Sequence, residues 1–123
     1  MPARSTPPTD GVNRPLSEIK AELFKALAHP ARVRALEVLT EGERSVSELQ
    51  PLVGIESSHL SQQLGVLRRA GLVTTRKEGS AVIYALRDPL VGELLAVAKR
   101  LLLSSLTITR ELLDDLTAEL AAT

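Results

Sequence analysis

The amino-acid sequence predicts a mainly helical α+β fold that carries one small β-hairpin. Apolar residues recur at helical spacing over residues 16–70, two strand-like segments flank a Gly-Ser turn, and leucines recur at alternating spacings of four and three near the end. Aromatic residues make up only 2% of the 123 residues, so Leu, Val, Ala and Ile must build the core. Such a core favours helices packed on helices, and the length allows about one domain.

A disordered arm and two helices are predicted at the start of the chain. Residues 1–15 are rich in Pro, Ser and Thr and offer too little apolar surface to offset the entropy cost of ordering. Ser17 is the predicted N-cap of the first helix. The His29-Pro30 pair ends that helix, because the residue before a proline disfavours the helical conformation. Pro30 then suits the first turn of a second helix.

A short helix is predicted over residues 45–53, opened by Ser47 and ended by Gly54. Its expected inward side chains are Leu49, Leu52 and Val53. The next helix begins at Ser57 or Glu56 as the cap and extends to residue 70, and Gly71 follows in the position that glycine favours after a last turn. The expected inward stripe of helix 57–70 is Leu60, Leu64 and Leu67.

A hairpin and a long helix complete the prediction. The strands are expected at residues 72–77 and 81–86, with the tip at residues 78–80. The Asp88-Pro89 pair begins the last helix. Its predicted seam against another helix is Leu102, Leu106, Thr109, Leu113, Leu116 and Leu120. Poor helix formers over residues 104–109 allow a bend there.

This order of elements is that of a winged helix-turn-helix with a long C-terminal dimerisation helix. Three segments carry a resemblance to a known family: LFKALAHPARVRALEVL (residues 23–39), SSHLSQQLGVLRRAGLV (57–73) and KEGSAVIYAL (77–86). They resemble the arsenic-repressor (ArsR/SmtB) family of bacterial transcription regulators. The resemblance implies a winged helix-turn-helix DNA-binding domain at residues 16–88, with a dimerisation helix at 89–121 as part of the same domain. It also implies a homodimeric repressor, although activation stays open.

The predicted partner is double-stranded DNA with a pseudo-palindromic operator, bound by helix 57–70 in the major groove and by wing 76–81 on the backbone or in the minor groove. If the leucine stripe faces the core, short polar side chains face outward, and these groups can contact base edges. The expected base contacts are Ser57, Ser58, His59, Ser61 and Gln62, whereas Gln63 leans towards the core. The expected backbone contacts are Arg68, Arg69, Arg76 and Lys77.

Charge is balanced over the whole chain, with 15 Lys and Arg against 15 Asp and Glu. Any attraction to DNA must therefore come from a local patch. Residues 56–80 carry four cations and two carboxylates, a local excess of two positive charges. A protein-interaction module that kept the winged fold without specific DNA binding is the alternative. An enzyme is not expected, because the sequence shows no nucleophile–base pair and no phosphate-binding glycine loop.

The self-partner is a second copy of the chain in a homodimer. The expected interface residues are Leu23, Leu94, Leu95, Leu102, Leu106, Leu113 and Leu116. No apolar run is long enough to span a membrane, and the N-terminus lacks the apolar stretch of a secretory signal. We therefore expect a cytoplasmic protein without a membrane partner.

The sequence departs from the metal sites that are common in the resembled family. Those sites use cysteines in the short helix or His and carboxylate groups on the C-terminal helix, but this chain has no cysteine and no histidine after His59. His29 is expected to be structural, and two histidines far apart in the sequence do not make a site. The acidic stretch over residues 111–119 is interpreted as solvated charge. No metal or cofactor is expected, and the effector is unknown.

Overall fold

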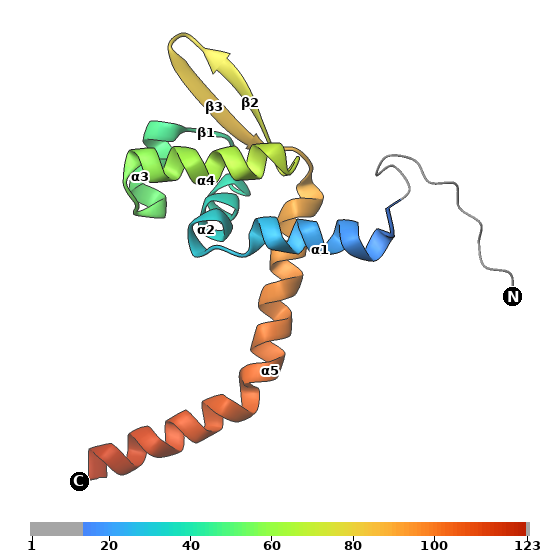
Figure 1. The fold of residues 1–123 in the computed structure, drawn as a ribbon. Helices are drawn as coiled ribbons and strands as arrows, with labels where there is room; N and C mark the ends of the chain where they lie inside the picture. The colour runs from blue at the N-terminus through green and yellow to red at the C-terminus, as the bar shows by residue number, and fades with distance from the viewer. Residues whose placement is uncertain (1–13, 123) are drawn as a thin grey trace, which may run out of the picture.

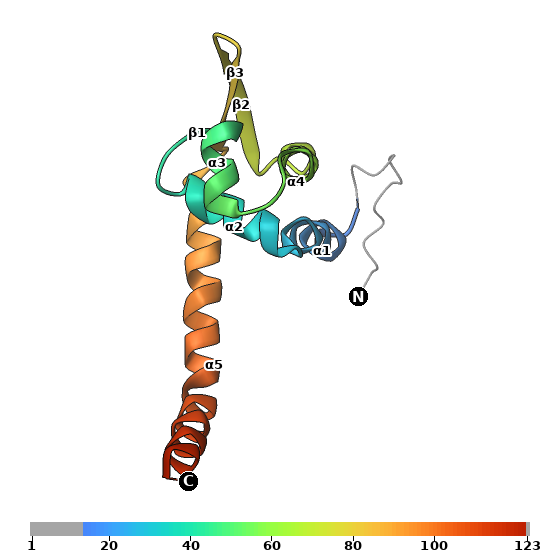
Figure 2. The same cartoon turned by 90° about the vertical axis from the view of Figure 1, so that its left-hand side faces the viewer.

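The fold is mainly helical with a small antiparallel sheet, which confirms the predicted class. The computed structural model describes residues 14–122, and the side chains of all of these except residues 106–108. The elements are α1 (Leu16–Leu27), α2 (Pro30–Leu39), β1 (Arg44–Ser45), α3 (Val46–Val53), α4 (Ser57–Arg69), β2 (Val73–Glu78), β3 (Ala81–Leu86) and α5 (Pro89–Ala122). The β2–β3 hairpin extends from one side of the helices and α5 leaves on the other (Figures 1 and 2). Residues 1–13 of the predicted arm lie outside the described residues.

Helix α1 begins earlier than predicted, so the assignment of Ser17 as its cap was wrong. Pro15 is the N-cap, and its carbonyl accepts the amides of Glu18 and Ile19. A proline suits this place because its fixed φ fits the entry into a helix and its missing N–H is not needed there. Arg14 forms ion pairs with Glu18 and with a second glutamate of α1, which ties the chain before the helix to its first turns.

Helix α3 begins within one residue of the predicted start, but the assignment of Ser47 as its cap was wrong, because the cap is Ser45. The Ser45 hydroxyl accepts the amide of Glu48 at 3.2 Å, and the Glu48 carboxylate accepts the amide of Ser45 at 2.8 Å, which is a complete capping box. The prediction that Leu52 points inward was wrong, since Leu52 is 45% exposed. A helix of eight residues buries only a narrow face, and here that face centres on Leu49.

Helix α4 packs as predicted, with Leu60, Leu64 and Leu67 completely buried. The core that they join also contains Leu36 of α2, Leu49 of α3 and Val73 of β2 among its members. Gly71 has a φ of +78°, the left-handed conformation that glycine adopts at little cost after a helix. The chain can therefore turn sharply from α4 into β2.

The sheet has three strands in the order β1-β3-β2, one more than the predicted hairpin. Strand β2 pairs with β3 from Val73 opposite Leu86 to Glu78 opposite Ala81, which leaves a two-residue turn at Gly79-Ser80. Gly79 has a φ of +63°, as a type II′ turn requires at its first central position. The short strand β1 adds to the free edge of β3, and this joins the hairpin to the chain between α2 and α3.

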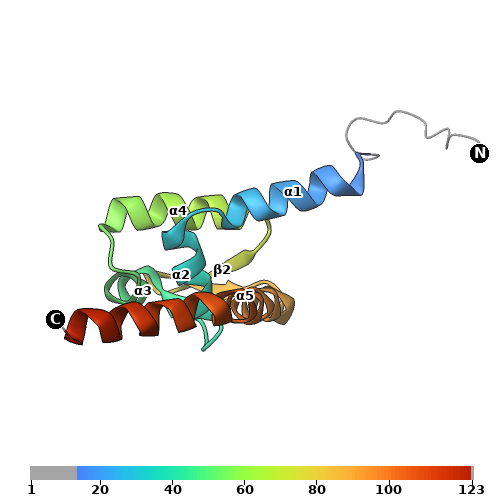
Figure 3. The same cartoon turned by 90° about the horizontal axis from the view of Figure 1, so that it is seen from below.

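Helix α5 is helical throughout its described length, and its axis bends part-way along (Figures 1 and 3). The Asp88 carboxylate accepts the amide of Leu90 at 2.8 Å and so begins the helix. Close to this start α5 approaches α2 tightly, because a Cβ placed on Gly92 would lie 2.9 Å from Thr40 Cγ2. No helix in residues 14–122 is both long enough and apolar enough to cross a membrane.

Candidate nucleic-acid interface

One face of α4 is polar and exposed to solvent. Its members, which we call the recognition face, are Ser57, Ser58, His59, Ser61 and Gln62, and all five are exposed. The three buried leucines of α4 hold the opposite side of the helix in the core, so helical geometry turns these polar side chains outward. The structure thus brings together, on one element, all the residues that the sequence predicts for base contact.

The recognition face continues towards the end of α4 over Gly65 and Arg69. A Cβ on Gly65 would lie 3.2 Å from Nη1 of Arg69, so the arginine folds back along the helix over the glycine. Arg68 and Arg69 are both exposed in the last turn of α4. Their cations therefore stand beside the polar side chains that precede them, which is the arrangement needed to contact backbone phosphates next to a groove.

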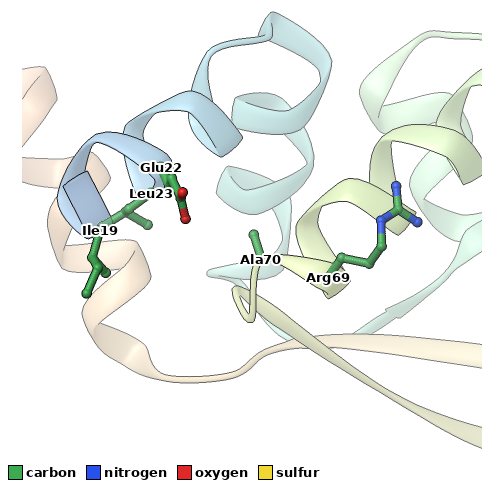
Figure 4. A pocket seen from close by; sticks show the side chains of 5 residues that line it. All are labelled: Ile19, Glu22, Leu23, Arg69 and Ala70. Atoms are coloured by element: carbon green, nitrogen blue, oxygen red, sulfur yellow. The ribbon is translucent and has the colours of Figure 1, made fainter. Parts of the chain in front are cut away.

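A hollow of about 290 Å³ separates the end of α4 from α1. Ile19, Glu22 and Leu23 line it from α1, and Arg69 and Ala70 line it from α4. Figure 4 shows that the Arg69 guanidinium points away from the α1 side chains. The arginine is therefore directed along α4 rather than into the hollow.

The start of α4 carries a competing interaction. The Ser58 hydroxyl donates to the carboxylate of Glu56, the residue at the N-cap. Glu56 itself makes no side-chain capping bond to α4. A base contact by Ser58 requires that this serine leave Glu56, whereas Ser61 and Gln62 have no such bond in the described part of the chain.

His59 meets a second histidine that is remote in the sequence. The rings of His29 and His59 lie edge to face, with centroids 5.8 Å apart and planes at 89°. The two histidines, which are far apart in the sequence, become neighbours because the turn between α1 and α2 packs against α4. His29 is structural as predicted: its Nδ1 accepts the amide of Ala31 at 3.0 Å and caps α2. Residues 14–122 contain no group of three or more His, Cys, Asp or Glu residues placed to hold a metal ion.

Gln63 faces the protein interior, as predicted, and is 9% exposed. Its Oε1 accepts a hydrogen bond from Nη1 of Arg32 at 2.8 Å. The other terminal nitrogen, Nη2, donates to the backbone oxygen of Lys25 at 3.3 Å. Arg32 therefore connects α4 to the last turn of α1. Local sequence patterns do not predict this link, because it joins residues that are far apart in the chain.

The wing carries one bound cation and one accessible cation. Arg76 of β2 forms ion pairs with Glu43, which precedes β1, and with Glu78 at 2.6 Å. The hydrogen bond from Arg76 lowers the pKa of Glu43, and the hydrogen bonds to both carboxylates raise the pKa of Arg76. Lys77 is exposed and has no ion pair among the described residues.

The fold pairs one of the cations predicted for this surface with a carboxylate from outside residues 56–80. Glu43 lies outside residues 56–80 in the sequence, but the structure places its carboxylate against Arg76. Arg44 of β1 enters the same sheet beside Glu43, so the net excess of two positive charges is unchanged, but the Arg76 cation is neutralised by Glu43. Sequence reasoning missed Glu43 because the pairing depends on how β1, β3 and β2 lie in the sheet.

The predicted dimer residues fall into two groups. Leu94 and Leu23 are half-buried and Leu95 packs against the core of its own chain, so these three offer only part of their surface to a partner. The second group is more than half exposed and consists of Leu102, Leu113 and Leu116. The side chain of Leu106 lies outside the described residues.

Helix α1 adds apolar surface that the sequence analysis did not name. Leu16 is 63% exposed, and Phe24, the one phenylalanine of the chain, is 56% exposed. Phe24 lies two residues before Ala26, the buried residue of α1, and therefore on the opposite side of the helix.

Comparisons with known proteins identify the family of this chain. Residues 29–75 match the bacterial regulatory protein, arsR family. The chain is 54% identical over 112 residues to the uncharacterized HTH-type transcriptional regulator Rv0081 of Mycobacterium tuberculosis H37Rv, over 90% of this chain and 98% of the relative. It is 47% identical over 75 residues to the biofilm growth-associated repressor of Agrobacterium fabrum, over 61% of this chain and 64% of that protein. The chain belongs to the arsR family.

Solved structures agree with this arsR-family assignment and confirm the winged helix-turn-helix. The crystal structure of Rv0081 superimposes with a TM-score of 0.72 at 56% identity, covering 79% of this chain and 98% of that one. A homodimeric winged helix-turn-helix DNA-binding domain from Mycobacterium bovis superimposes with a TM-score of 0.68 at 28% identity, covering 77% of this chain and 93% of that one. The resemblance seen in the sequence is thus confirmed, and the chain is a transcriptional regulator.

Proposed function

We propose that this arsR-family regulator is a homodimeric repressor that binds a specific operator through α4 in the major groove. The observation that carries the proposal is the recognition face of α4, which is polar, accessible and followed by two arginines. An α-helix fits the major groove, where each base pair presents a distinct set of donors and acceptors. The names of two relatives support it: one is a repressor and the other a homodimeric DNA-binding domain.

Each part of the surface has its own role in the proposal. Gln62 carries an amide that matches the N6 and N7 edge of adenine, and Ser57, Ser58, His59 and Ser61 supply further donors and acceptors. Arg68 and Arg69 contact backbone phosphates beside the groove. Arg76 and Lys77 place the wing on the backbone or the minor groove. Lys77 can contact a phosphate directly, whereas Arg76 must first break its ion pairs with Glu43 and Glu78.

The dimer in this proposal forms through α5 together with α1. Long apolar side chains stand exposed on both helices, and exposed apolar surface of this extent marks an interaction site. A twofold axis between two copies sets the recognition helices about one turn of DNA apart, which suits a pseudo-palindromic operator. Residues 16–88 are then the DNA-binding part and α5 the dimerisation part of one domain. A protein that acts on bacterial DNA works in the cytoplasm, and the proposal includes neither a catalytic role nor a membrane.

Fluorescence anisotropy tests the proposal with a duplex taken from upstream of the protein's own gene and a scrambled duplex of the same length. A specific regulator binds the first at least about a thousandfold more tightly. Gln62→Ala removes one bidentate contact from each half-site, at ~1–3 kcal/mol of discrimination each, and should therefore reduce that ratio by about thirtyfold or more. Gln50→Ala, on the neighbouring α3, is the matched control and should leave the ratio unchanged. Equal losses on both duplexes would contradict the assigned role of Gln62.

Two outcomes address the proposal as a whole. Equal weak binding to both duplexes calls for selection of bound fragments from the genome, and failure to enrich any sequence would contradict specific regulation. No binding to either duplex at low salt would favour a protein-interaction module instead, because even non-specific binding is strong when few counterions compete.

A further inference from the structure

The turn between α1 and α2 together with the first turn of α2 (residues 28–32), which we call the α1–α2 corner, contacts α4 at two points. The ring of His29 meets His59 edge to face at 5.8 Å, and Nη1 of Arg32 donates to Oε1 of Gln63 at 2.8 Å. His59 and Gln63 are four residues apart, so both contacts lie along one side of the helix. The corner therefore holds α4 from the side, while Gln62 stays accessible next to Gln63.

Both contacts are anchored within the corner itself. Nδ1 of His29 accepts the amide of Ala31, which fixes the imidazole at the N-terminus of α2. Arg32 is held by its second bond, to the backbone oxygen of Lys25 in the last turn of α1. The two side chains that reach α4 are thus fixed at their own end, as a positioning contact requires.

The Arg32 contact is not explained by stability alone, because placing a guanidinium at this site carries a desolvation cost. Its Nε is buried without a hydrogen-bond partner in the described part of the chain, and both acceptors of the terminal nitrogens are uncharged. Arg32 is half-buried, and a cation that is partly removed from water without a carboxylate carries a desolvation cost that apolar side chains do not. What the guanidinium supplies and an apolar side chain cannot is a directional link between Gln63 of α4 and the end of α1.

We propose that the α1–α2 corner determines DNA specificity without touching DNA. Arg32 and Gln63 set the orientation of α4 in the groove, and His29 sets the position of the His59 ring. The three are positioning residues for the base contacts of Gln62 and His59. This inference rests on the proposed function, because it concerns how the same recognition face meets its operator.

Two substitutions at Gln63 test the Arg32 contact. Gln63→Met keeps the size and removes the acceptor, whereas Gln63→Glu keeps an acceptor for Arg32. The measured quantity is the ratio of affinities for the operator and the scrambled duplex, in which a uniform charge effect cancels. Gln63→Met should lower the ratio about tenfold, as expected for one misplaced base contact, with scrambled-duplex binding unchanged within about twofold. Gln63→Glu should keep the ratio within about threefold of the original.

A second pair of variants tests the histidine contact. His29→Asn keeps a capping oxygen for α2 but removes the ring, since asparagine is among the best N-cap residues. Selection from operators with one randomised half-site should show that His29→Asn and His59→Ala relax the same base position. The double variant should relax it no further, because both changes remove one interaction. Relaxation at different positions, or none with His29→Asn, would overturn the role of His29.

The outcomes separate this inference from the proposed function. A wild-type protein that does not distinguish operator from scrambled DNA overturns both. A wild-type protein that does, together with a Gln63→Met variant that keeps the full ratio, overturns only the positioning role. If Gln63→Met loses binding to both duplexes in parallel with its melting temperature, the contact serves stability, and the positioning role is likewise overturned.

Discussion

The two wing cations should differ in how they contribute to DNA binding. Lys77 is exposed with no ion pair in residues 14–122, but Arg76 donates to both Glu43 and Glu78. A phosphate contact by Arg76 must first break two ion pairs, whereas Lys77 gives up only water. We therefore predict that Lys77→Ala flattens the salt dependence of operator binding clearly more than Arg76→Ala does.

The magnitude follows from counterion release. Each phosphate contact contributes about 0.9 to the slope of log affinity against log salt, so a dimer without Lys77 loses ~1.8. When the salt is raised from about 50 to 200 mM, the affinity of both proteins falls, and the factor by which it falls should be roughly ten times smaller for the Lys77→Ala variant than for the wild type. Arg76→Ala should change the slope by less than about half as much.

Anisotropy titrations on the operator at four or more salt concentrations measure these slopes. Lys20→Ala, an equivalent change on α1 away from the wing, is the control and should leave the slope unchanged. Equal slopes for the Lys77→Ala and Arg76→Ala variants, or a larger effect of Arg76→Ala, would show that the ion pairs to Glu43 and Glu78 do not restrain Arg76 on DNA.

Four further predictions concern stability and assembly. Leu64→Ala should lower the free energy of unfolding by about 2–5 kcal/mol in urea, because Leu64 is completely buried in the core. Ser45→Ala should lower it by about 1 kcal/mol through loss of the α3 cap. The hydrogen bond from the Ser45 amide lowers the pKa of Glu48 in the folded state, so this stabilisation is present above the unfolded-state pKa and is lost as the pH falls through the folded-state pKa. Urea unfolding from about pH 6 to pH 3 should show this loss, and it should be absent in Glu48→Gln; an equal loss in that variant would assign it to another carboxylate. Leu116→Glu should shift the protein towards monomer in size-exclusion chromatography with light scattering, whereas Thr117→Glu should not; a dimer unaffected by both would place the interface elsewhere on α5.

Local patterns predicted the elements that carry the recognition face. The leucine stripe of α4 and the glycine at Gly71 place that helix correctly to within one residue, since helical periodicity and the left-handed turn are properties of neighbouring residues. The two strands of the wing were likewise predicted from the turn residues between them. The caps were harder, because several serines and prolines near a helix start compete for the role. Ser45 took it in α3, since Glu48 lies at the distance that completes a capping box.

Strand β1 shows where local reasoning ended. Arg44 and Ser45 carry no strand signal, and they form a strand only because β3 offers them an unpaired edge. The same pairing brings Glu43 towards Arg76 and neutralises that cation of the wing. A pattern read over neighbouring residues contains no information on such partners.

The sequence by itself determined the family, the order of the elements and which side of α4 faces outward. These depend on side-chain spacing along a single helix or hairpin, which is set by chain geometry. The tertiary structure alone decided that Arg76 is held by Glu43, that His29 meets His59, and that Arg32 reaches Gln63. Each of these contacts joins residues far apart in the chain, so its formation depends on how the helices and the sheet pack and not on the sequence around either partner.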